Sequence, residues 1–187
     1  MIKFLVSIAL IVIATGCGSD PVENLLRDTR FETVGNVGNS DWSVIQHAGE
    51  RSYEWNAEDG LLTARWIGPE VDGHVAQMIR VQGLEGKKLR FSVELSGDTE
   101  ELPNVPSELT GVQVEVQGMA PGVPRSLGVG PLFIRAGSPP VAAGSFGWMV
   151  QNVVFEVPPY ATTIRVSIGL GMEGVLRIRN PVLAVYP

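Results

Sequence analysis

Hydrophobic and polar residues alternate one by one along several short segments of this chain. The clearest is LRFSVEL at 89–95, in which Leu89, Phe91, Val93 and Leu95 occupy every second position. Because successive side chains of a β-strand point to opposite faces, this alternation predicts a half-buried strand. The same reasoning predicts further strands at 42–46, 52–55, 61–67, 75–81, 112–118, 132–135, 148–157, 163–170, 175–179 and 182–186.

The connections between the predicted strands are rich in Gly, Pro, Asn and Asp, and no segment of the sequence shows the period of an amphipathic helix. Many short strands without intervening helices are typical of a β-sandwich or a β-barrel. Between two of the strands, NAEDG predicts a hairpin whose loop covers residues 57–60. That loop places Trp55 opposite Leu62, so that Tyr53, Trp55 and Trp66 share the face that points toward the core.

The N-terminus, MIKFLVSIALIVIATGC, carries one lysine and then an apolar stretch at 4–14. This stretch is shorter than the roughly 20 residues of a membrane-spanning helix and matches the apolar region of a secretory signal peptide. Small residues at 14–16 lead directly to Cys17, the only cysteine of the chain. The segment resembles the lipobox of bacterial lipoproteins, which implies cleavage before Cys17 and attachment of fatty acyl chains such as palmitate to it.

This resemblance divides the chain into a signal peptide at 1–16, a lipidated tether at 17–23 and a single β-sandwich domain at 24–187. Two or three acyl chains hold a protein durably on a membrane, whereas one chain binds only marginally. Gly18 follows the cysteine, where an aspartate would retain a lipoprotein at the inner membrane. We therefore expect a lipid-anchored protein of the cell envelope, at the outer membrane and facing the periplasm or the exterior. A plain signal peptide, or a short anchor helix, with an incidental cysteine is the alternative.

The charge of the chain narrows the range of partners. The sequence has 14 basic and 20 acidic residues, a net charge of −6, which becomes −7 without residues 1–16 and their single charge, Lys3. An acidic surface disfavours nucleic acid, because binding to phosphates requires Lys and Arg. The content of 44% hydrophobic and 18% charged residues fits a globular domain rather than a disordered chain.

Three segments of the mature chain share a pattern with a known family. They are NLLRDTRFE at 24–32 followed by Trp42, AQMIRVQGLEGKKLRFSVELSG at 76–97, and FEVPPYATTIRVSIGLGMEGVLRIRNPVLAVY at 155–186. They resemble the opening, central and closing parts of jelly-roll carbohydrate-binding modules with galactose-binding-like topology. The resemblance implies a jelly-roll β-sandwich as the fold and a saccharide as the ligand.

Members of this family often hold a structural calcium ion with the help of a carboxylate near the C-terminal end. In this chain Arg179 and Asn180 follow Ile178 at that place, so Glu32 lacks the usual acidic partner. Calcium requires several hard oxygen ligands, and a guanidinium group opposes a cation. The resemblance therefore carries no metal site over to this chain.

Residues with catalytic potential are few. His47 and His74 lie 27 positions apart, without the spacing of a metal pair, and are expected to be solvated loop residues. Carboxylates gather at Glu70 with Asp72 and within 98–101, and a glycosidase would need two of them across a cleft. Ordinary loop surface is the simpler interpretation, so we expect no enzymatic activity and no cofactor, with a glycosidase or lyase as the less favoured alternative.

A saccharide site needs aromatic platforms for the sugar rings and planar polar groups for the hydroxyls, because a buried unpaired polar group costs about 1–3 kcal/mol. Trp148 lies on a predicted strand with a mixed polar and apolar face and is the favoured platform. The polar faces of two other predicted strands supply hydrogen-bonding partners. The expected ligand-binding residues are Trp148, Arg90, Gln113, Glu115 and Gln117. For each polar residue, a plain solvent-facing position is the alternative.

Together these features predict a lipid-anchored, non-catalytic protein that recognises a saccharide at the cell envelope. The alternative of a different class is a structural or assembly lipoprotein that docks on an envelope protein, through a sheet face or the Gly- and Pro-rich segment at 118–147. A groove lined by Trp148 and the strand of Gln113 would favour the saccharide. A flat apolar patch would favour the protein partner.

Overall fold

The computed structural model describes most of the chain that follows the predicted signal peptide. The described residues are 23–35, 38, 40–46, 51–68, 73–101, 110–118 and 132–187. Several features named above lie outside the described residues: the predicted signal peptide, the expected lipidation site Cys17, His47, Glu70, Asp72 and positions 119–131 of the Gly- and Pro-rich segment.

The described residues form eleven strands and no helix, so no helix among them is long and apolar enough to cross a bilayer. The strands are β1 (Val34–Gly35), β2 (Trp42–Gln46), β3 (Tyr53–Glu58), β4 (Leu61–Trp66), β5 (Gly73–Arg80), β6 (Lys88–Glu100), β7 (Gly111–Gly118), β8 (Leu132–Gly137), β9 (Gly144–Glu156), β10 (Ala161–Leu170) and β11 (Glu173–Val185). Every strand expected from the alternating pattern is present, with small shifts of its ends. The two segments expected at 175–179 and 182–186 belong to one strand, β11, which has an irregular register between Arg179 and Val182.

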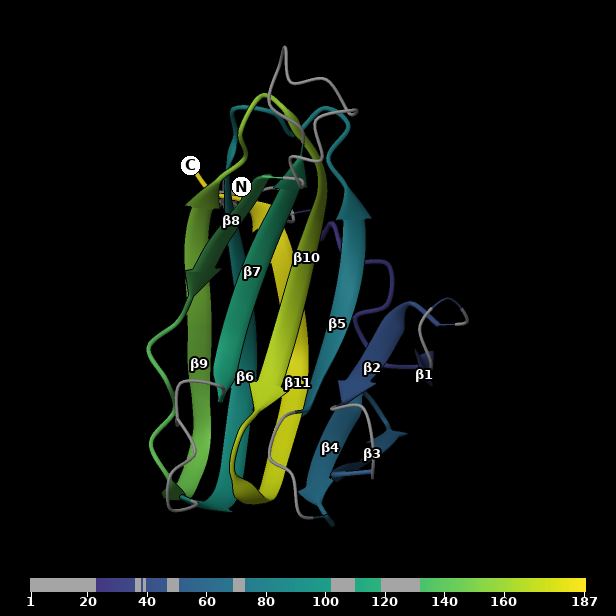
Figure 1. Cartoon of the computed structure of the whole chain (residues 1–187), viewed down its shortest axis with the longest axis vertical. Helices are drawn as coiled ribbons and strands as arrows, with labels where there is room; N and C mark the ends of the chain where they lie inside the picture. The colour runs from purple at the N-terminus through teal and green to yellow at the C-terminus, as the bar shows by residue number, and fades with distance from the viewer. Residues whose placement is uncertain are drawn as a thin grey trace, which may run out of the picture.

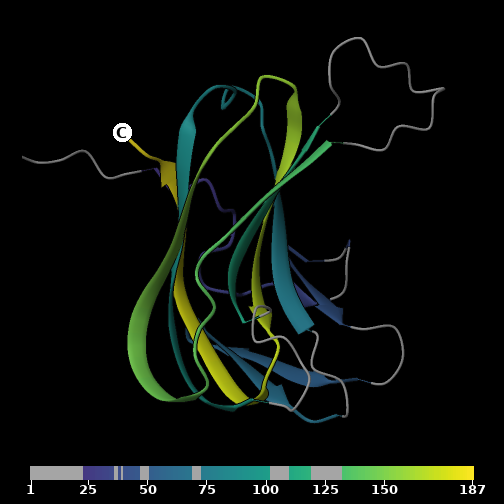
Figure 2. The ribbon, with the colours of Figure 1, turned by 60° about the vertical axis from the view of Figure 1, so that its left-hand side comes forward.

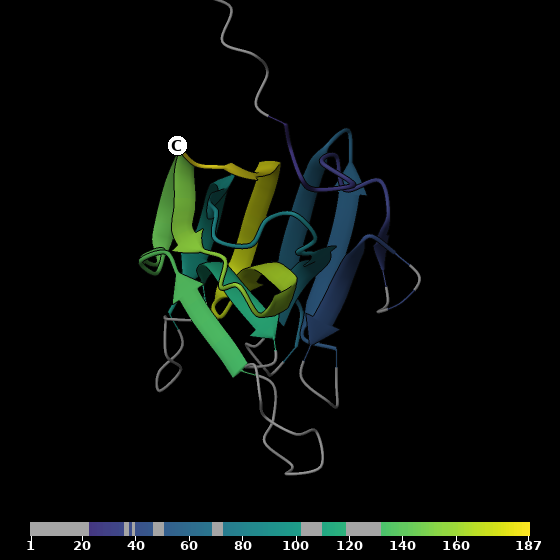
Figure 3. The ribbon, with the colours of Figure 1, turned by 90° about the horizontal axis from the view of Figure 1, so that it is seen from above.

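The strands form two sheets that pack face to face. Sheet A, which faces the viewer in Figure 1, has the order β1-β2-β5-β10-β7-β8, and sheet B has the order β3-β4-β11-β6-β9. Figures 2 and 3 show the two layers from the side and from above. Strands far apart in the sequence are neighbours, such as β5 beside β10 and β11 between β4 and β6. The predicted all-β jelly-roll sandwich is confirmed.

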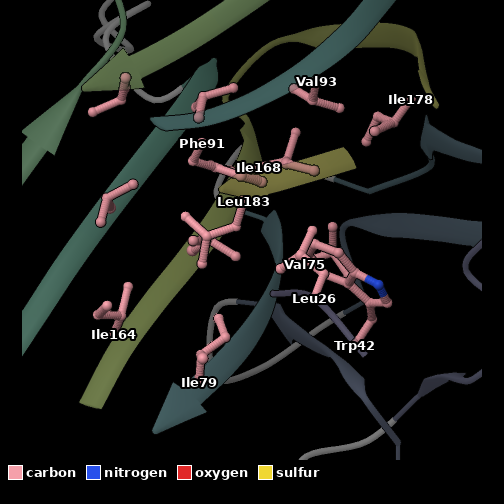
Figure 4. Packing of buried hydrophobic residues seen from close by; sticks show 14 of the residues in the cluster. Leu26, Trp42, Val75, Ile79, Phe91, Val93, Ile164, Ile168, Ile178 and Leu183 are labelled. Atoms are coloured by element: carbon pink, nitrogen blue, oxygen red, sulfur yellow. The ribbon is translucent and has the colours of Figure 1, made fainter. Parts of the chain in front are cut away.

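The core between the sheets consists of the side chains that the alternation assigned to the inner face of each strand. Leu89 and Phe91 of β6 are fully buried, as are Ile164 and Ile168 of β10 on the opposite sheet. Figure 4 shows how side chains from both sheets, including Leu183 of β11, converge in this layer. Burial of each such side chain stabilises the fold by about 1.5–3 kcal/mol.

The hairpin between β3 and β4 differs from the expected one. Its loop has two residues, Asp59 and Gly60, with φ angles of 50° and 79°, as a type I′ turn requires. Trp55 therefore pairs with Ala64, whereas the longer loop expected from the sequence placed it opposite Leu62. Because the register differs by two residues, each side chain keeps its face. Tyr53 is fully buried, and the two tryptophans of the hairpin pack against the core, so the predicted faces are confirmed.

The first described residues connect the two sheets. The Oδ1 atom of Asn24 accepts a hydrogen bond from the backbone N–H of Leu183 on β11 at 3.0 Å. The N–H of Leu25 donates to the carbonyl of Leu183 at 2.8 Å. Further along, the N–H of Arg27 donates to Oε1 of the buried Gln77 on β5 at 2.9 Å. The segment that follows the predicted tether is thus fixed first to sheet B and then to sheet A.

One carboxylate organises the loop that precedes β1. Asp28 accepts hydrogen bonds from the backbone N–H groups of Arg30 at 3.0 Å and Thr33 at 2.9 Å, while its own carbonyl accepts the indole N–H of the buried Trp42 at 2.6 Å. Burial alone would raise the pKa of Asp28, but the hydrogen bonds from the loop outweigh burial and lower the pKa. The ionised carboxylate therefore holds this loop against the core at neutral pH.

Candidate functional site

The structure places the five residues expected to bind a ligand on two opposite surfaces. Gln113, Glu115 and Gln117 lie on β7 in sheet A. Arg90 on β6 and Trp148 on β9 belong to sheet B and are exposed on its outer side. The core, about 10 Å thick, separates the outer faces of the two sheets. The five residues therefore do not form one groove, and the expected combination of Trp148 with the strand of Gln113 does not exist.

The outer face of sheet A is hollowed where β5, β10, β7 and β8 lie side by side. This hollow, the sheet A groove, has a volume of about 580 Å³, and ligand pockets commonly measure about 300–1,000 Å³. Its described lining consists of Gly73, His74, Thr110, Gly111, Val112, Gln113, Val114, Glu115, Arg135, Ala136, Gly137, Ser138, Arg165, Ser167 and Gly169. Polar residues from all four strands thus surround one cavity.

Small residues in neighbouring strands leave the space that forms the groove. Ser167 of β10 lies beside Gln113 of β7, which in turn lies beside Gly137 of β8. One step further along the strands, Gly169 is paired with Gly111. Because glycine and serine have little or no side chain, the surface is low at these positions. The larger polar side chains around them form the sides of the groove.

A polar network crosses the groove and centres on Arg165 of β10. One guanidinium nitrogen lies 3.6 Å from the carboxylate of Glu115, and both side chains are largely buried. Another guanidinium nitrogen hydrogen-bonds to Nε2 of His74. Glu115 is also the register partner of Arg135 on β8. The groove therefore presents cationic donors, a carboxylate acceptor and an imidazole within one continuous surface.

Sequence reasoning missed part of this set. His74 was expected to be a solvated loop residue, but it lies on β5 and contacts Arg165. Arg165, Ser167 and Arg135 were not singled out at all. A signal for the first two was present, because the outward positions of the segment 163–170 alternate with its buried ones. What the sequence could not show was that this strand lies between β5 and β7.

The outer face of sheet B carries a different cluster, which surrounds Trp148. The guanidinium of Arg179 lies 3.9 Å from the centre of the indole ring. Arg179 also forms an ion pair with Glu94 at 2.7 Å, and the side-chain N–H of Asn180 donates to the same carboxylate at 2.9 Å. These hydrogen bonds, that from Asn180 first, lower the pKa of Glu94. The cluster is a mutually satisfied group of large side chains on the surface.

Apolar side chains extend this surface along β9, which is one of the two edge strands of sheet B. Trp148 is 41% exposed, and Val150 is 62% exposed on the same strand. Met149 and Val154 are exposed as well. Val150 and Val154 are the register partners of Glu94 and Arg90 on β6, so they lie on the outer face of sheet B and form an apolar stripe beside Trp148.

Members of the family that this chain resembles often hold a structural calcium ion, but the surroundings of Glu32 do not favour a cation. Its carboxylate lies 3.7 Å from the guanidinium of Arg30, a neighbour that opposes a cation. Arg179 and Asn180, which stand where family members carry a calcium-binding carboxylate, contact Glu94 on the outer face of sheet B instead. Within the part of the chain that the structure describes, no three side chains of His, Cys, Asp or Glu gather at a common point.

Comparisons with known proteins identify the fold. The sequence matches no protein-family model and no curated protein. The structure is similar to the xylanase 10B modules CBM22-1 and GH10 of Clostridium thermocellum in complex with xylohexaose, with a TM-score of 0.52, 11% identity and coverage of 79% of this chain and 26% of that chain. It is also similar to a Bacteroides thetaiotaomicron protein that carries the name of a sugar-binding protein, with a TM-score of 0.51, 12% identity and coverage of 88% and 100%.

A further similar structure is a xylan-binding domain from family 22 of the carbohydrate-binding modules. The TM-score is 0.50, the identity is 14%, and the match covers 84% of this chain and 92% of that domain. At such identities the likeness shows the fold, which is a jelly-roll β-sandwich. The match covers about a quarter of the xylanase chain.

Proposed function

We propose that this protein is a non-catalytic binding protein of the cell envelope that recognises a saccharide in the sheet A groove. The observation that carries the proposal is the groove itself, in which planar polar side chains from four neighbouring strands surround a cavity of about 580 Å³. The fold supports the proposal, since similar structures include a xylan-binding domain and a xylanase module pair with bound xylohexaose.

The chemistry of the groove suits sugar hydroxyls, which both donate and accept hydrogen bonds. Arg165 and Arg135 supply donors, Glu115 supplies acceptors, and the amide of Gln113 supplies both. The described lining contains no Phe, Tyr or Trp, so hydrogen bonding rather than stacking would provide most of the recognition. A ligand that left these groups unpaired would lose about 1–3 kcal/mol for each of them, which makes the hydroxyl pattern the basis of specificity.

The groove favours binding over hydrolysis. A glycosidase uses two carboxylates, one on each side of the scissile bond. Glu115 is the only carboxylate in the described lining, and it is paired with Arg165 at 3.6 Å. Asp98, another acid noted in the sequence, lies on sheet B and accepts a hydrogen bond from Ser145 at 2.6 Å.

Calorimetry and a glycan array with the mature chain test the saccharide proposal. The panel should contain plant, bacterial and host polysaccharides, including xylo- and galacto-oligosaccharides. We expect saturable binding with a stoichiometry of about one to one, as a single groove requires. Absence of binding to every member of the panel would remove the proposal.

We also propose that acyl chains on Cys17 anchor the protein at the outer membrane, on the strength of the lipobox resemblance. Labelled palmitate should enter the wild-type protein and not the Cys17→Ser variant. If neither protein takes up the label, or if both fractionate alike, the anchoring proposal is wrong while the saccharide proposal stands.

A second candidate function follows from the apolar stripe on β9. Exposed Trp148, Val150 and Val154 are the kind of surface that docks on another protein. A pull-down from membranes that recovers one stoichiometric partner, unaffected by added saccharide and lost in Val150→Asp, would favour this function. Recovery that saccharide abolishes would favour the groove.

A further inference from the structure

One end of the sandwich combines the start of the described chain with basic, aromatic and aliphatic side chains. Asn24 is hydrogen-bonded to Leu183 on β11. Three residues later, the N–H of Tyr186 donates to the carbonyl of Lys88 at 2.9 Å. The anchor end, as we call it, consists of the exposed residues Lys87, Lys88, Arg90, Val185 and Tyr186.

The composition of the anchor end is unlike that of the rest of the protein. Lys87 and Lys88 are the only lysines of the sequence after Lys3, although the mature chain is acidic. Tyr186 is 39% exposed, and the guanidinium of Arg90 lies 5.5 Å from its ring centre. Exposed tyrosines, together with lysines that extend their charge to the headgroups, are typical of protein surfaces at the membrane–water interface.

Aliphatic side chains complete this surface. Val185 is 47% exposed, and Val154, also exposed, is the register partner of Arg90. Glu156 lies opposite Lys88 in the same pair of strands, so the positive excess is small. The apolar and aromatic groups therefore contribute to contact with a bilayer alongside the electrostatic attraction of anionic lipid.

The tether limits how far this end can lie from the membrane. Six residues lie between Cys17 and Asn24, and the seven steps from one Cα to the next span at most about 25 Å in an extended chain. Because Asn24 is fixed to β11, the anchor end is the part of the domain closest to the attachment point. A short tether also keeps the local concentration of lipid headgroups high around these side chains.

The sheet A groove lies toward the opposite end of the same strands. Thr163 and its partner Arg80 are at the anchor end, next to the connection in which Val157 donates to the carbonyl of Lys87. The groove begins at Arg165, two residues along β10 from Thr163, and extends to Gly169 and its partner His74, six residues along the strand and about 20 Å away.

We propose that the anchor end rests on anionic lipid headgroups, so that the sandwich stands on the membrane with the sheet A groove held outward. This inference rests on the proposed lipidation of Cys17. It assigns Lys87, Lys88, Arg90 and Tyr186 a role in orientation, and it explains how a short tether leaves the groove open to a large polysaccharide.

The test uses the full chain, purified from bacterial membranes and reconstituted into vesicles of phosphatidylethanolamine with phosphatidylglycerol. Two variants, Val185→Cys and Glu100→Cys, each offer one free thiol for an environment-sensitive fluorophore when Cys17 is acylated. Glu100 is exposed at the opposite end of β6 from Lys88, lies outside the groove lining and serves as the matched control. We expect the label at 185 to be shielded from aqueous iodide and the label at 100 to be quenched.

A variant that combines Lys87→Gln and Lys88→Gln with Val185→Cys tests whether the two lysine charges hold the anchor end on the anionic lipid. Each lysine at an anionic surface contributes about fivefold, so the equilibrium constant for the contact should fall by up to about 25-fold, with iodide quenching restored. Equal quenching at 185 and 100 would overturn the proposed orientation. A mass spectrum without acyl chains would overturn the anchoring proposal and this one together, while saccharide binding on the same preparation would be unaffected.

Discussion

The strands of both sheets have the same alternating pattern of residues, but the outer faces of the two sheets are different surfaces. On sheet A, Ser167 and Gly169 follow Arg165 along one strand, and the small residues leave a groove. On sheet B, Arg179 and Trp148 fill the corresponding space, and the guanidinium covers the indole ring at 3.9 Å. The comparison shows that the size of the outward side chains, rather than their polarity, decides whether a strand face becomes a cavity or a closed surface.

The largest effect should come from removal of the central cation of the groove. Arg165→Ala deletes the contacts to Glu115 and His74 and the donors proposed to bind hydroxyls. Hydrogen bonds to charged groups are worth about 1.5–3 kcal/mol, so the Kd for the saccharide should rise about 10- to 100-fold. Calorimetry measures this change. Arg179→Ala on sheet B is the matched control and should leave the Kd unchanged; the reverse result would move the site to sheet B.

Filling the groove should have the next largest effect. A Cβ at Gly137 would lie 3.6 Å from the carbonyl oxygen of Val112, which is an ordinary contact. The Gly137→Leu side chain should therefore fill part of the groove without straining the backbone. We expect an affinity loss of about tenfold or more, equal to about 1.4 kcal/mol. The free energy of unfolding should change by no more than about 0.5 kcal/mol.

The control for this variant is Gly147→Leu on β9, where the added Cβ would meet open space. It adds the same side chain to the face of the other sheet. Binding curves for wild type and Gly147→Leu should coincide. If Gly137→Leu binds as tightly as both, the ligand does not occupy the groove.

Removal of the aromatic platform should have a small effect on saccharide binding. Trp148→Ala deletes the ring beneath the Arg179 guanidinium, an exposed cation–π contact worth about 0.5–1 kcal/mol, and should lower the free energy of unfolding by a similar amount. Because Trp148 and the groove lie on opposite sheets, the Kd should stay within about twofold of the wild-type value. A loss of binding as large as that of Arg165→Ala would restore Trp148 as a ligand platform.

The smallest effect concerns the pH dependence of the cluster on sheet B. Hydrogen bonds from Asn180 and Arg179 lower the pKa of Glu94, so the carboxylate stays ionised at neutral pH and its contacts are lost only as the pH falls through this lowered pKa. Emission from Trp148 should therefore be constant around neutral pH and change only in the acidic range, where Glu94 gains its proton. Glu94→Gln should remove this acid-induced change, and a transition that persists in that variant would assign it to another group.

The sequence was a good guide to the strands and their faces. Phe91 and Ile168 occupy alternate apolar positions and are buried, and the hairpin at Asp59 and Gly60 carries a turn signal that was assigned to a longer loop. Alternation is a local property, so it survives errors in loop length. An even shift of register, as in this hairpin, leaves every side chain on its face.

The site was harder to predict, because it depends on which strands become neighbours. The alternating pattern singles out Gln113 and Glu115, but it does not show that their strand lies beside Arg165 on β10, which in turn pairs with β5 and His74. Trp148 was grouped with them because sugar sites use aromatic residues, but β9 joins the other sheet. Contacts between strands that lie about 50 to 90 residues apart depend on the topology of the whole sheet, so they cannot be predicted from any single segment.

The isotope-labelled protein should be titrated with an oligosaccharide that it binds, while its backbone amide signals are followed by NMR. If the saccharide occupies the sheet A groove, the signals of Gln113, Glu115, Arg165 and His74 shift with saturation, while those of Trp148 and Glu94 stay in place. Shifts confined to Trp148, Glu94 and their neighbours on sheet B would contradict it.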